Sequence, residues 1–302
     1  MALRTAVLAI AFAVILPAQS LRVMTFNVRY PNPEDGANIW ENRRELLVDT
    51  IRRSDPDVFG TQEMFYSQGA FIAEQLPQYE WFGVSRRGNH EDEHMGVFYK
   101  RGKLFPLESG NFWLSETPSV AGSMSWDVSL PRMVTWARFR EASGREFWLY
   151  NTHFPHRQED AAARFECAKV IAADIAKRVP ADADLILIGD FNSAADSDVH
   201  DLLTKNLEDS RATAKQKLGL ETTSSRWVGA KEGRRIDWVL YRGGLQPLVN
   251  ETVEFTAARA IRRITTRCSW SFCGTRFSLS RCAACRRWFV RGRYACLGER
   301  WW

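Results

Sequence analysis

Short apolar runs alternate with amphipathic stretches along most of this chain, and this alternation restricts its fold more than any other feature. Runs typical of β-strands lie at residues 21–28, 57–63, 95–99, 133–139, 147–151, 185–188 and 236–241. Stretches with helical spacing lie at residues 40–54, 66–76 and 159–177. The run 185–188 is wholly apolar, which is typical of a strand buried on both faces. The alternation therefore predicts an α/β fold in which helices cover sheets.

A chain of 302 residues is long enough for one large domain or for two. The sequence contains no internal repeat and no low-complexity linker. We therefore expect a single domain over residues 21–256.

The first twenty residues stand apart from this domain. They combine a positive start at Arg4, an apolar run over residues 6–16 and the small residues of Ala18-Gln19-Ser20. The run is too short to span a bilayer. We expect residues 1–20 to be a signal peptide and the protein to be secreted or periplasmic, with a buried N-terminal strand or helix as the alternative.

Residues 257–302 differ in composition from the rest of the chain. They contain eleven arginines, one glutamate and five of the six cysteines, but no aspartate or lysine. Their charge is +10, and since the whole chain carries +5, the remaining residues carry −5. The basic overall balance therefore does not indicate a nucleic-acid partner for the body of the protein. A basic interaction tail, an additional domain and a shifted reading frame are the three interpretations of this segment.

Six polar residues interrupt or follow the apolar strands. Most fall at or just beyond the carboxyl end of a predicted strand, where α/β sheets gather ligands. Each has an ordinary structural explanation when taken singly, such as a turn or a helix cap. Six of them in this order indicate a shared site. They are Asn27, Glu63, His153, Asp190, Asn192 and Asp237.

The motifs around these residues are Thr25-Phe26-Asn27-Val28, Thr61-Gln62-Glu63, Asn151-Thr152-His153-Phe154, Gly189-Asp190-Phe191-Asn192 and Arg235-Ile236-Asp237. This series resembles the endonuclease/exonuclease/phosphatase family of DNase I-like phosphoester hydrolases, and in particular a secreted branch of it. The Gly-Asp-Phe-Asn motif after an apolar strand is the most specific part. The resemblance implies a four-layer sandwich, with two mixed β-sheets between helices and the site at one edge.

The resemblance also implies a metal site. Glu63 would be the principal ligand of a divalent ion, and Asn27 would assist it. The expected ion is Mg²⁺, with Mn²⁺ as the alternative. Mg²⁺ prefers oxygen ligands and keeps several water molecules, so one carboxylate and one amide oxygen suffice.

Catalytic and substrate-binding roles follow from the same resemblance. Asp190 would orient and deprotonate the attacking water, and Asn192 would hold a phosphate oxygen. His153 would donate to the phosphoryl group or the leaving oxygen, with a charge-assisted bond when protonated. Arg132 and His156 are expected to contact the substrate.

These residue types supply what hydrolysis of a phosphodiester needs, namely an activated water, a cation and donors for the phosphoryl oxygens. We therefore predict a Mg²⁺-dependent phosphoester hydrolase of the nuclease or phosphodiesterase/phosphatase type. The substrate could be a nucleic acid, a phospholipid head group or a small phosphodiester, because this fold serves many substrates. No protein partner is implied, and we expect a monomer.

One part of the family pattern is missing. By the resemblance, Asp237 orients a second histidine from a Ser-Asp-His motif, yet no histidine follows His200. Read from the third base of the Ala260 codon, with permitted synonymous codons, residues 260–272 can encode Tyr-Pro-Ser-Asp-His-Tyr-Pro-Val-Leu-Val-Glu-Phe. We therefore interpret residues 257–302 as an aberrant tail that follows a frame-shift between Arg259 and Ala260, with the last core strand lost. The remaining histidines, His90 and His94, lie in a polar loop and are expected to be solvated.

Two other functions stay open. The missing histidine favours a catalytically inactive relative that binds phosphate or metal. The composition of the tail allows a nucleic-acid or membrane binder that acts through its arginines. The five matching motifs favour the hydrolase.

Restoring the reading frame after Arg259 is expected to raise both metal-dependent hydrolysis and the melting temperature. A lost acid–base group costs about 10²–10⁴-fold in rate, and a lost strand exposes a sheet edge. Hydrolysis of a generic phosphodiester and thermal unfolding would be measured for both chains, beside the nucleotide sequence at codons 259 and 260. Equal rates and equal melting temperatures would contradict the frame-shift.

Overall fold

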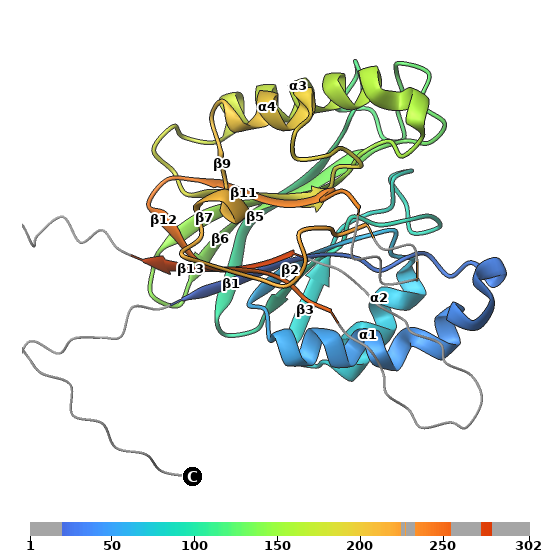
Figure 1. The fold of residues 1–302 in the computed structure, drawn as a ribbon, viewed down its shortest axis with the longest axis horizontal. Helices are drawn as coiled ribbons and strands as arrows, with labels where there is room; N and C mark the ends of the chain where they lie inside the picture. Colours follow the sequence, from blue (N-terminus) through green and yellow to red (C-terminus); the bar gives the residue numbers. More distant parts are fainter. Residues whose placement is uncertain (1–19, 225–226, 228–232, 255–272, 280–302) are drawn as a thin grey trace, which may run out of the picture.

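The computed structural model describes residues 20–224, 227, 233–254 and 273–279. Two mixed β-sheets lie face to face in it (Figure 1). The strand order of the first sheet is β10 (Gln216–Leu218), β12 (Leu245–Thr252), β13 (Cys273–Leu279), β1 (Leu21–Asn27), β2 (Val58–Gln62), β4 (Val97–Lys100) and β3 (Tyr79–Phe82). The order of the second sheet is β5 (Leu104–Trp113), β6 (Met133–Glu141), β7 (Glu146–His153), β8 (Leu185–Asp190), β11 (Asp237–Arg242) and β9 (Glu208–Asp209).

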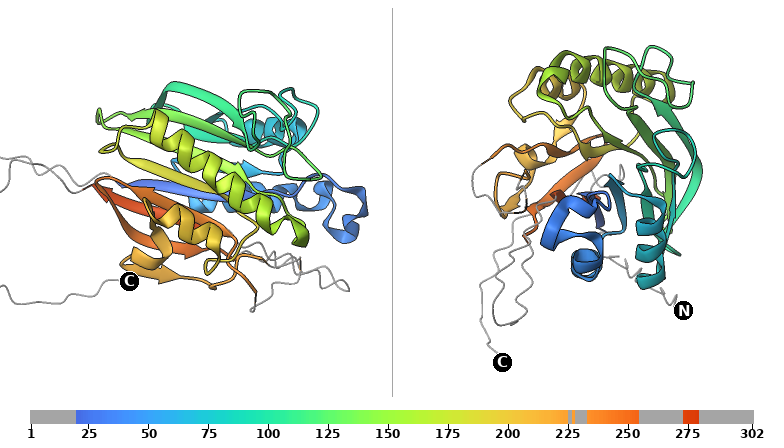
Figure 2. Two further views of the ribbon diagram at one scale, coloured as in Figure 1. Left: turned by 90° about the horizontal axis from the view of Figure 1, so that it is seen from above. Right: turned by 90° about the vertical axis from the view of Figure 1, so that its right-hand side faces the viewer.

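Helices cover the outer faces of the two sheets, as the views in Figure 2 show. The first sheet carries α1 (Trp40–Ser54) and α2 (Tyr66–Gln75), and the second carries α3 (Ala161–Arg178) and α4 (Asp198–Thr204). The short α5 (Ser210–Thr213) contacts β11 and β12, and 3₁₀ turns lie at Pro33–Asn38 and Gln158–Asp160. The predicted four-layer α/β sandwich is confirmed.

The apolar strand β8 illustrates why these layers form. Alternate side chains of a strand point to opposite faces of the sheet. Leu185 and Leu187 share a core with the inner face of α3, whereas Ile186 and Ile188 share a core with the other sheet. All four side chains are fully buried. In β8 these four positions are therefore apolar, and the polar side chain appears only at its last residue, Asp190.

A buried polar side chain crosses the space between the two sheets. The amide group of Asn151, on β7, donates to the backbone oxygens of Thr61 and Gly96, each at 3.0 Å. Its oxygen accepts a hydrogen bond of 2.6 Å from the Gln62 side chain on β2. A Cβ atom at Gly60 would lie 2.4 Å from Cγ of Asn151, so only glycine leaves room for this contact. Asn151 thus ties β7 of one sheet to β2 of the other.

The seven strands and three helices predicted from the sequence all occur, with ends within two residues of those expected. The sequence pattern missed the strands β3, β5, β9, β10 and β12 and the helices α4 and α5. Strand β5 has no clean alternation because it lies at the edge of its sheet, contains Pro106 and has an irregular register between Pro106 and Glu108. Because of its exposure at the edge and this irregular register, the sequence of β5 lacks the apolar alternation from which strands are predicted.

The segment 273–279 forms β13, which pairs antiparallel with both β1 and β12. The expectation that the sheet lacks a last strand is therefore wrong for the described backbone. The domain boundary at residue 256 stays a prediction. The expected signal peptide lies outside the described residues apart from Ser20, as does the tail apart from β13. Within the described part of the chain, no helix has the length and hydropathy needed to cross a membrane.

Replacing Asn151 by leucine, which has a similar size, is expected to lower the free energy of unfolding by about 3 kcal/mol, because each buried polar group left unpaired costs about 1–3 kcal/mol. Urea unfolding measures the change. The control is Asn111→Leu on the edge strand β5, where a half-buried amide accepts one hydrogen bond from Thr135. An equal loss of unfolding free energy in the two variants would contradict the stabilising role assigned to the hydrogen bonds of Asn151 between the sheets.

Candidate active site

Three of the predicted site residues lie side by side at one edge of the second sheet. Asp190, the last residue of β8, is in register with His153 on β7 and with Asp237 on β11. Gly189 permits this arrangement, because a Cβ atom there would lie 2.3 Å from the backbone oxygen of Thr152. The glycine of the Gly-Asp-Phe-Asn motif is thus required for β8 to approach β7 closely.

The first sheet contributes Asn27, at the end of β1, and Glu63, just after β2. The Asn27 amide nitrogen donates to Oε1 of Glu63 at 2.8 Å and to Oδ2 of Asp190 at 3.0 Å. One amide group therefore joins the carboxylates of the two sheets. The oxygen of Asn27 accepts a hydrogen bond of 3.0 Å from the Arg29 backbone. In this orientation it is the amide nitrogen of Asn27, and not the predicted ligand oxygen, that faces the carboxylates.

Two site residues adopt a left-handed backbone conformation, with φ of 58° at Glu63 and 47° at Asn192. Such conformations cluster at functional sites because the surrounding structure must hold them in place. The Asn192 backbone N–H donates to Oδ1 of Asp190 at 3.0 Å, and one of its side-chain hydrogens donates to the oxygen of Phe154 at 3.1 Å. The turn after β8 therefore fixes both Asn192 and the carboxylate before it.

Arg132 lies between two histidines. Its Nη1 atom is 2.8 Å from Nδ1 of His153, and its Nη2 atom is 3.0 Å from Nδ1 of His156. A guanidinium group can only donate, so both Nδ1 atoms accept and both ring protons lie on Nε2. Nε2 of His153 is 3.8 Å from Oδ2 of Asp190. Arg132 thus orients the imidazole of His153, which was expected to be catalytic, and that of His156, which was expected with Arg132 to contact the substrate.

The same contacts decide the charge of His153. Burial first, and the neighbouring guanidinium of Arg132 second, hold its pKa well below the ordinary value. Burial and Arg132 also lower the pKa of His156. A neutral His153 that donates from Nε2, and not the protonated form considered from the sequence, is therefore the state that this structure favours.

Carboxyl groups are crowded at the centre of the site. Burial raises the pKa of Asp190 to about 6, although the hydrogen bonds donated to it act in the opposite direction. Burial and the charge of Asp190 raise the pKa of Asp237 well above its usual range, and Glu63 adds to this effect. The nearest cation to Glu63 is Arg29, with 3.7 Å between Nη1 and Oε2. A divalent cation would relieve this crowding, so these oxygen donors fit one.

Asp237 has no histidine partner among the described residues. Its backbone N–H donates to the hydroxyl of Thr223 at 3.1 Å. The histidine that the family pattern would place beside it has no counterpart in this part of the chain.

A cavity of about 400 Å³ lies at this site, although Asn27, Asp190 and Asp237 are not among its lining residues. Five of the predicted residues line it, namely Glu63, Arg132, His153, His156 and Asn192. The residues that sequence reasoning missed are Arg29, Tyr30, Phe65, Arg86, Glu93 and Leu130.

Glu93 is the most informative of the residues that were missed. It is buried, its Oε2 atom lies 2.9 Å from Nη1 of Arg86, and burial raises its pKa to about 7. The expectation of a solvated loop holds for His90, which is exposed, but is wrong for His94, which is buried together with Asp92. Strand β4 is antiparallel to β2, so the residues before β4 lie beside the carboxyl end of β2. Only the strand direction, which the sequence does not reveal, brings Glu93 to the site.

Replacing Arg132 by methionine is expected to raise the pKa of both His153 and His156, because a nearby positive charge disfavours protonation of a histidine. Nitrogen NMR of the two rings across a pH titration measures the pKa and the tautomer. In the wild type both rings should carry their proton on Nε2. Unchanged pKa values in the variant, or a proton on Nδ1 in the wild type, would contradict the role assigned to Arg132.

The profile of the Endonuclease/Exonuclease/phosphatase family matches residues 24–278 of this sequence. An uncharacterised protein of Acanthamoeba polyphaga mimivirus is 29% identical over 163 residues, which make up 51% of this chain and 59% of that protein. This chain thus spans little more than half the length of that relative.

Solved structures are similar over a larger part of the chain. An endonuclease/exonuclease/phosphatase family protein of Bacteroides thetaiotaomicron has a TM-score of 0.80 and 28% identity, and the match covers 88% of this chain and 100% of that one. A mannosyl-6-phosphatase of the same species has a TM-score of 0.76 and 29% identity, with 86% and 99% covered. The chain therefore belongs to the endonuclease/exonuclease/phosphatase family, as its strand-end motifs predict.

Proposed function

We propose that this protein hydrolyses phosphoester bonds with a divalent metal ion, and that Asp190 takes the proton of the attacking water. The observation that carries this proposal is the position of Asp190. Its carboxylate accepts hydrogen bonds from Asn27 and from the Asn192 backbone and lies 3.8 Å from Nε2 of His153. A carboxyl group with a pKa near 6 is largely ionised at neutral pH and is still basic enough to accept a proton.

Glu63 is the residue proposed to hold the metal ion, and Asn27 would join it if its amide group rotated to present the oxygen. Mg²⁺ is the proposed ion, with Mn²⁺ as the alternative. When bound, the cation would neutralise phosphoryl charge and make the water more acidic. Among the described residues, no three His, Cys, Asp or Glu side chains are arranged to hold a metal ion together. Mg²⁺ suits such a site because it retains several water molecules.

The other side chains have roles that their hydrogen bonds support. The Nε2–H of His153 can donate to a phosphoryl or leaving oxygen, because Arg132 occupies the Nδ1 atom. Asn192 retains one amide hydrogen beside the one given to Phe154, and this hydrogen can hold a phosphate oxygen. Arg132 keeps its positive charge close to the cavity that both residues line.

A small phosphoester is the substrate that we propose. A cavity of about 400 Å³ is suited to a small molecule, and one similar structure is of a mannosyl-6-phosphatase. Nucleic acids and phospholipid head groups are the alternatives. The expected signal peptide supports action outside the cytoplasm, which N-terminal sequencing of exported protein would test by finding a start near Leu21.

An inactive phosphate- or metal-binding relative is the second candidate. The observation that favours it is the lack of a histidine beside Asp237 in the described part of the chain. Paired acid–base groups contribute strongly to such reactions, so the loss of one lowers the rate without removing the binding cleft.

Replacing Asp190 by asparagine is expected to lower kcat for a generic phosphate ester by about 10²–10⁴-fold, the usual contribution of an acid–base group. Removal of divalent ions with EDTA should abolish the hydrolysis, and Mg²⁺ should restore it. Asp201→Asn, at an exposed position of α4, is the matched control and should keep the rate. Full activity of the Asp190 variant would refute the proposed role. Absence of hydrolysis in the wild type, with phosphate binding intact, would favour the second candidate.

A further inference from the structure

A second cavity of about 600 Å³ adjoins the candidate active site. Both cavities are lined by His156 and Asn192, so they meet at these two side chains. Three arginines contribute to the second cavity, namely Arg157, Arg164 and Arg234, and none of its described lining residues is acidic. The charge of this cavity depends on how each arginine is paired.

Arg157 is already neutralised. Its Nε atom lies 3.0 Å from Oδ1 of Asp160, and its Nη1 atom lies 3.4 Å from Oε1 of Glu159. Its positive charge is therefore shared with two carboxylates beside it. Arg157 contributes little to an anion site.

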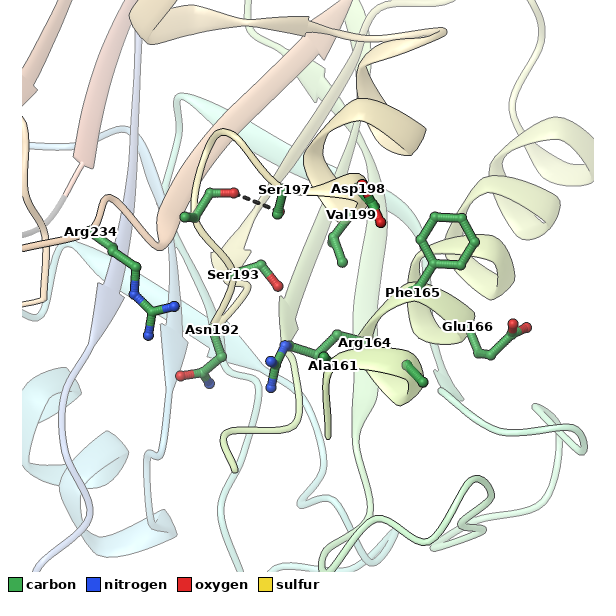
Figure 3. A pocket seen from close by; sticks show the side chains of 12 residues that line it. Ala161, Arg164, Phe165, Glu166, Asn192, Ser193, Ser197, Asp198, Val199 and Arg234 are labelled. Carbon is green, nitrogen blue, oxygen red and sulfur yellow. Dashed lines mark hydrogen bonds between the residues drawn. The ribbon is translucent and has the colours of Figure 1, made fainter. Parts of the chain in front are cut away.

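Arg164 and Arg234 differ from Arg157 in this respect. Arg164 is buried, and its Nη1 atom donates only to backbone oxygens, those of Pro155 at 3.1 Å and Arg157 at 2.7 Å. Arg234 forms no ion pair with the described residues. Arg164, Asn192 and Arg234 also line a neighbouring cavity of about 440 Å³, which Glu166 and Asp198 border as well. Figure 3 shows this neighbouring cavity, with the guanidinium groups of Arg164 and Arg234 directed toward Asn192 from opposite sides. Neither arginine forms an ion pair with a described carboxylate, and both line the same cavity.

Two arginines that line one cavity attract an anion into it. Burial lowers the pKa of Arg164, the charge of Asp160 raises it, and the charge of Arg234 has a smaller lowering effect. The bonds from Nη1 to the two backbone oxygens hold the Arg164 side chain in place. The hydroxyl of Ser224 lines the same cavity and adds a neutral donor. Guanidinium groups are well suited to phosphate because their planar donors match its oxygens.

We propose that Arg164 and Arg234 form a second phosphate subsite, which binds a phosphate group of the substrate next to the one that is hydrolysed. This inference rests on the proposed function, because it places the reacting phosphate in the cavity lined by Glu63, His153 and Asn192. It narrows the substrate to a phosphoester that carries a further phosphate. Such a group occurs in a nucleic-acid strand and in a small bisphosphorylated molecule.

The test measures binding, so it does not require turnover. Dissociation constants are determined by calorimetry at low salt without divalent metal for two ligand pairs. One pair is thymidine dinucleotide with and without a 5′-phosphate, and the other is glucose 1,6-bisphosphate with glucose 6-phosphate. The proteins are the wild type, Arg164→Met, Arg234→Met and the control Arg52→Met, an exposed position on α1. Arg234 is exposed, so its variant should fold even if the buried Arg164 variant does not.

In the wild type, the extra phosphate should tighten binding about tenfold or more in at least one pair, as expected for a charge-assisted contact. Arg234→Met and any folded Arg164→Met should lose this gain while keeping the affinity for the ligand with one phosphate fewer. The control should retain it. A gain confined to the nucleotide pair identifies a nucleic-acid strand as the source, and a gain confined to the sugar pair identifies a small bisphosphate.

Two results would overturn the subsite. One is a wild type in which neither extra phosphate tightens binding. The other is a uniform loss of affinity for both members of a pair in Arg234→Met, which would place this arginine on the reacting phosphate. Failure of the proposed function gives another result. Hydrolysis would then be absent, while the extra phosphate would still tighten ligand binding.

Discussion

The contact between the two sheets is the constraint on which the site depends. Asn151 holds β7 against β2 and against the oxygen of Gly96 through three buried hydrogen bonds, and Gly60 leaves the space for it. Each sheet alone carries only part of the site. Because the sheets are joined in this register, the ends of β1 and β2 face the ends of β7 and β8. The bond from Asn27 to both Glu63 and Asp190 is possible only in that arrangement.

Burial then determines the chemistry of the groups that meet there. Water is largely excluded from Asp190, Asp237 and His153, so charges on these side chains are costly unless a partner compensates them. The carboxyl groups respond with raised pKa values and the histidine with a lowered one. A site of this kind favours a bound cation among its carboxylates and a neutral histidine as donor. The arginines on its rim favour anions.

Much of this arrangement was predictable from local sequence patterns. The apolar runs such as 185–188 specify strands buried on both faces, and the polar residue Asp190 follows this run at the carboxyl end of its strand. The strand-end residues Asn27, Glu63, His153, Asp190, Asn192 and Asp237 were therefore visible as a set. The edge strand β5, half exposed and interrupted by Pro106, lacked the alternation that makes a strand recognisable.

By itself the sequence determined the layers, the family and the residues at the ends of the central strands, because these depend on periodicities and motifs that span a few residues. Only the tertiary structure decided which groups reach the site from elsewhere. Glu93 comes beside Glu63 because β4 is antiparallel to β2. Arg132 was expected at the site from the sequence, but its contact with Nδ1 of His153 depends on the antiparallel pairing of β6 and β7. Arg164 and Arg234 face one cavity although seventy residues separate them. Strand direction and long-range packing leave no local pattern, since they arise from contacts between segments that are distant in the chain.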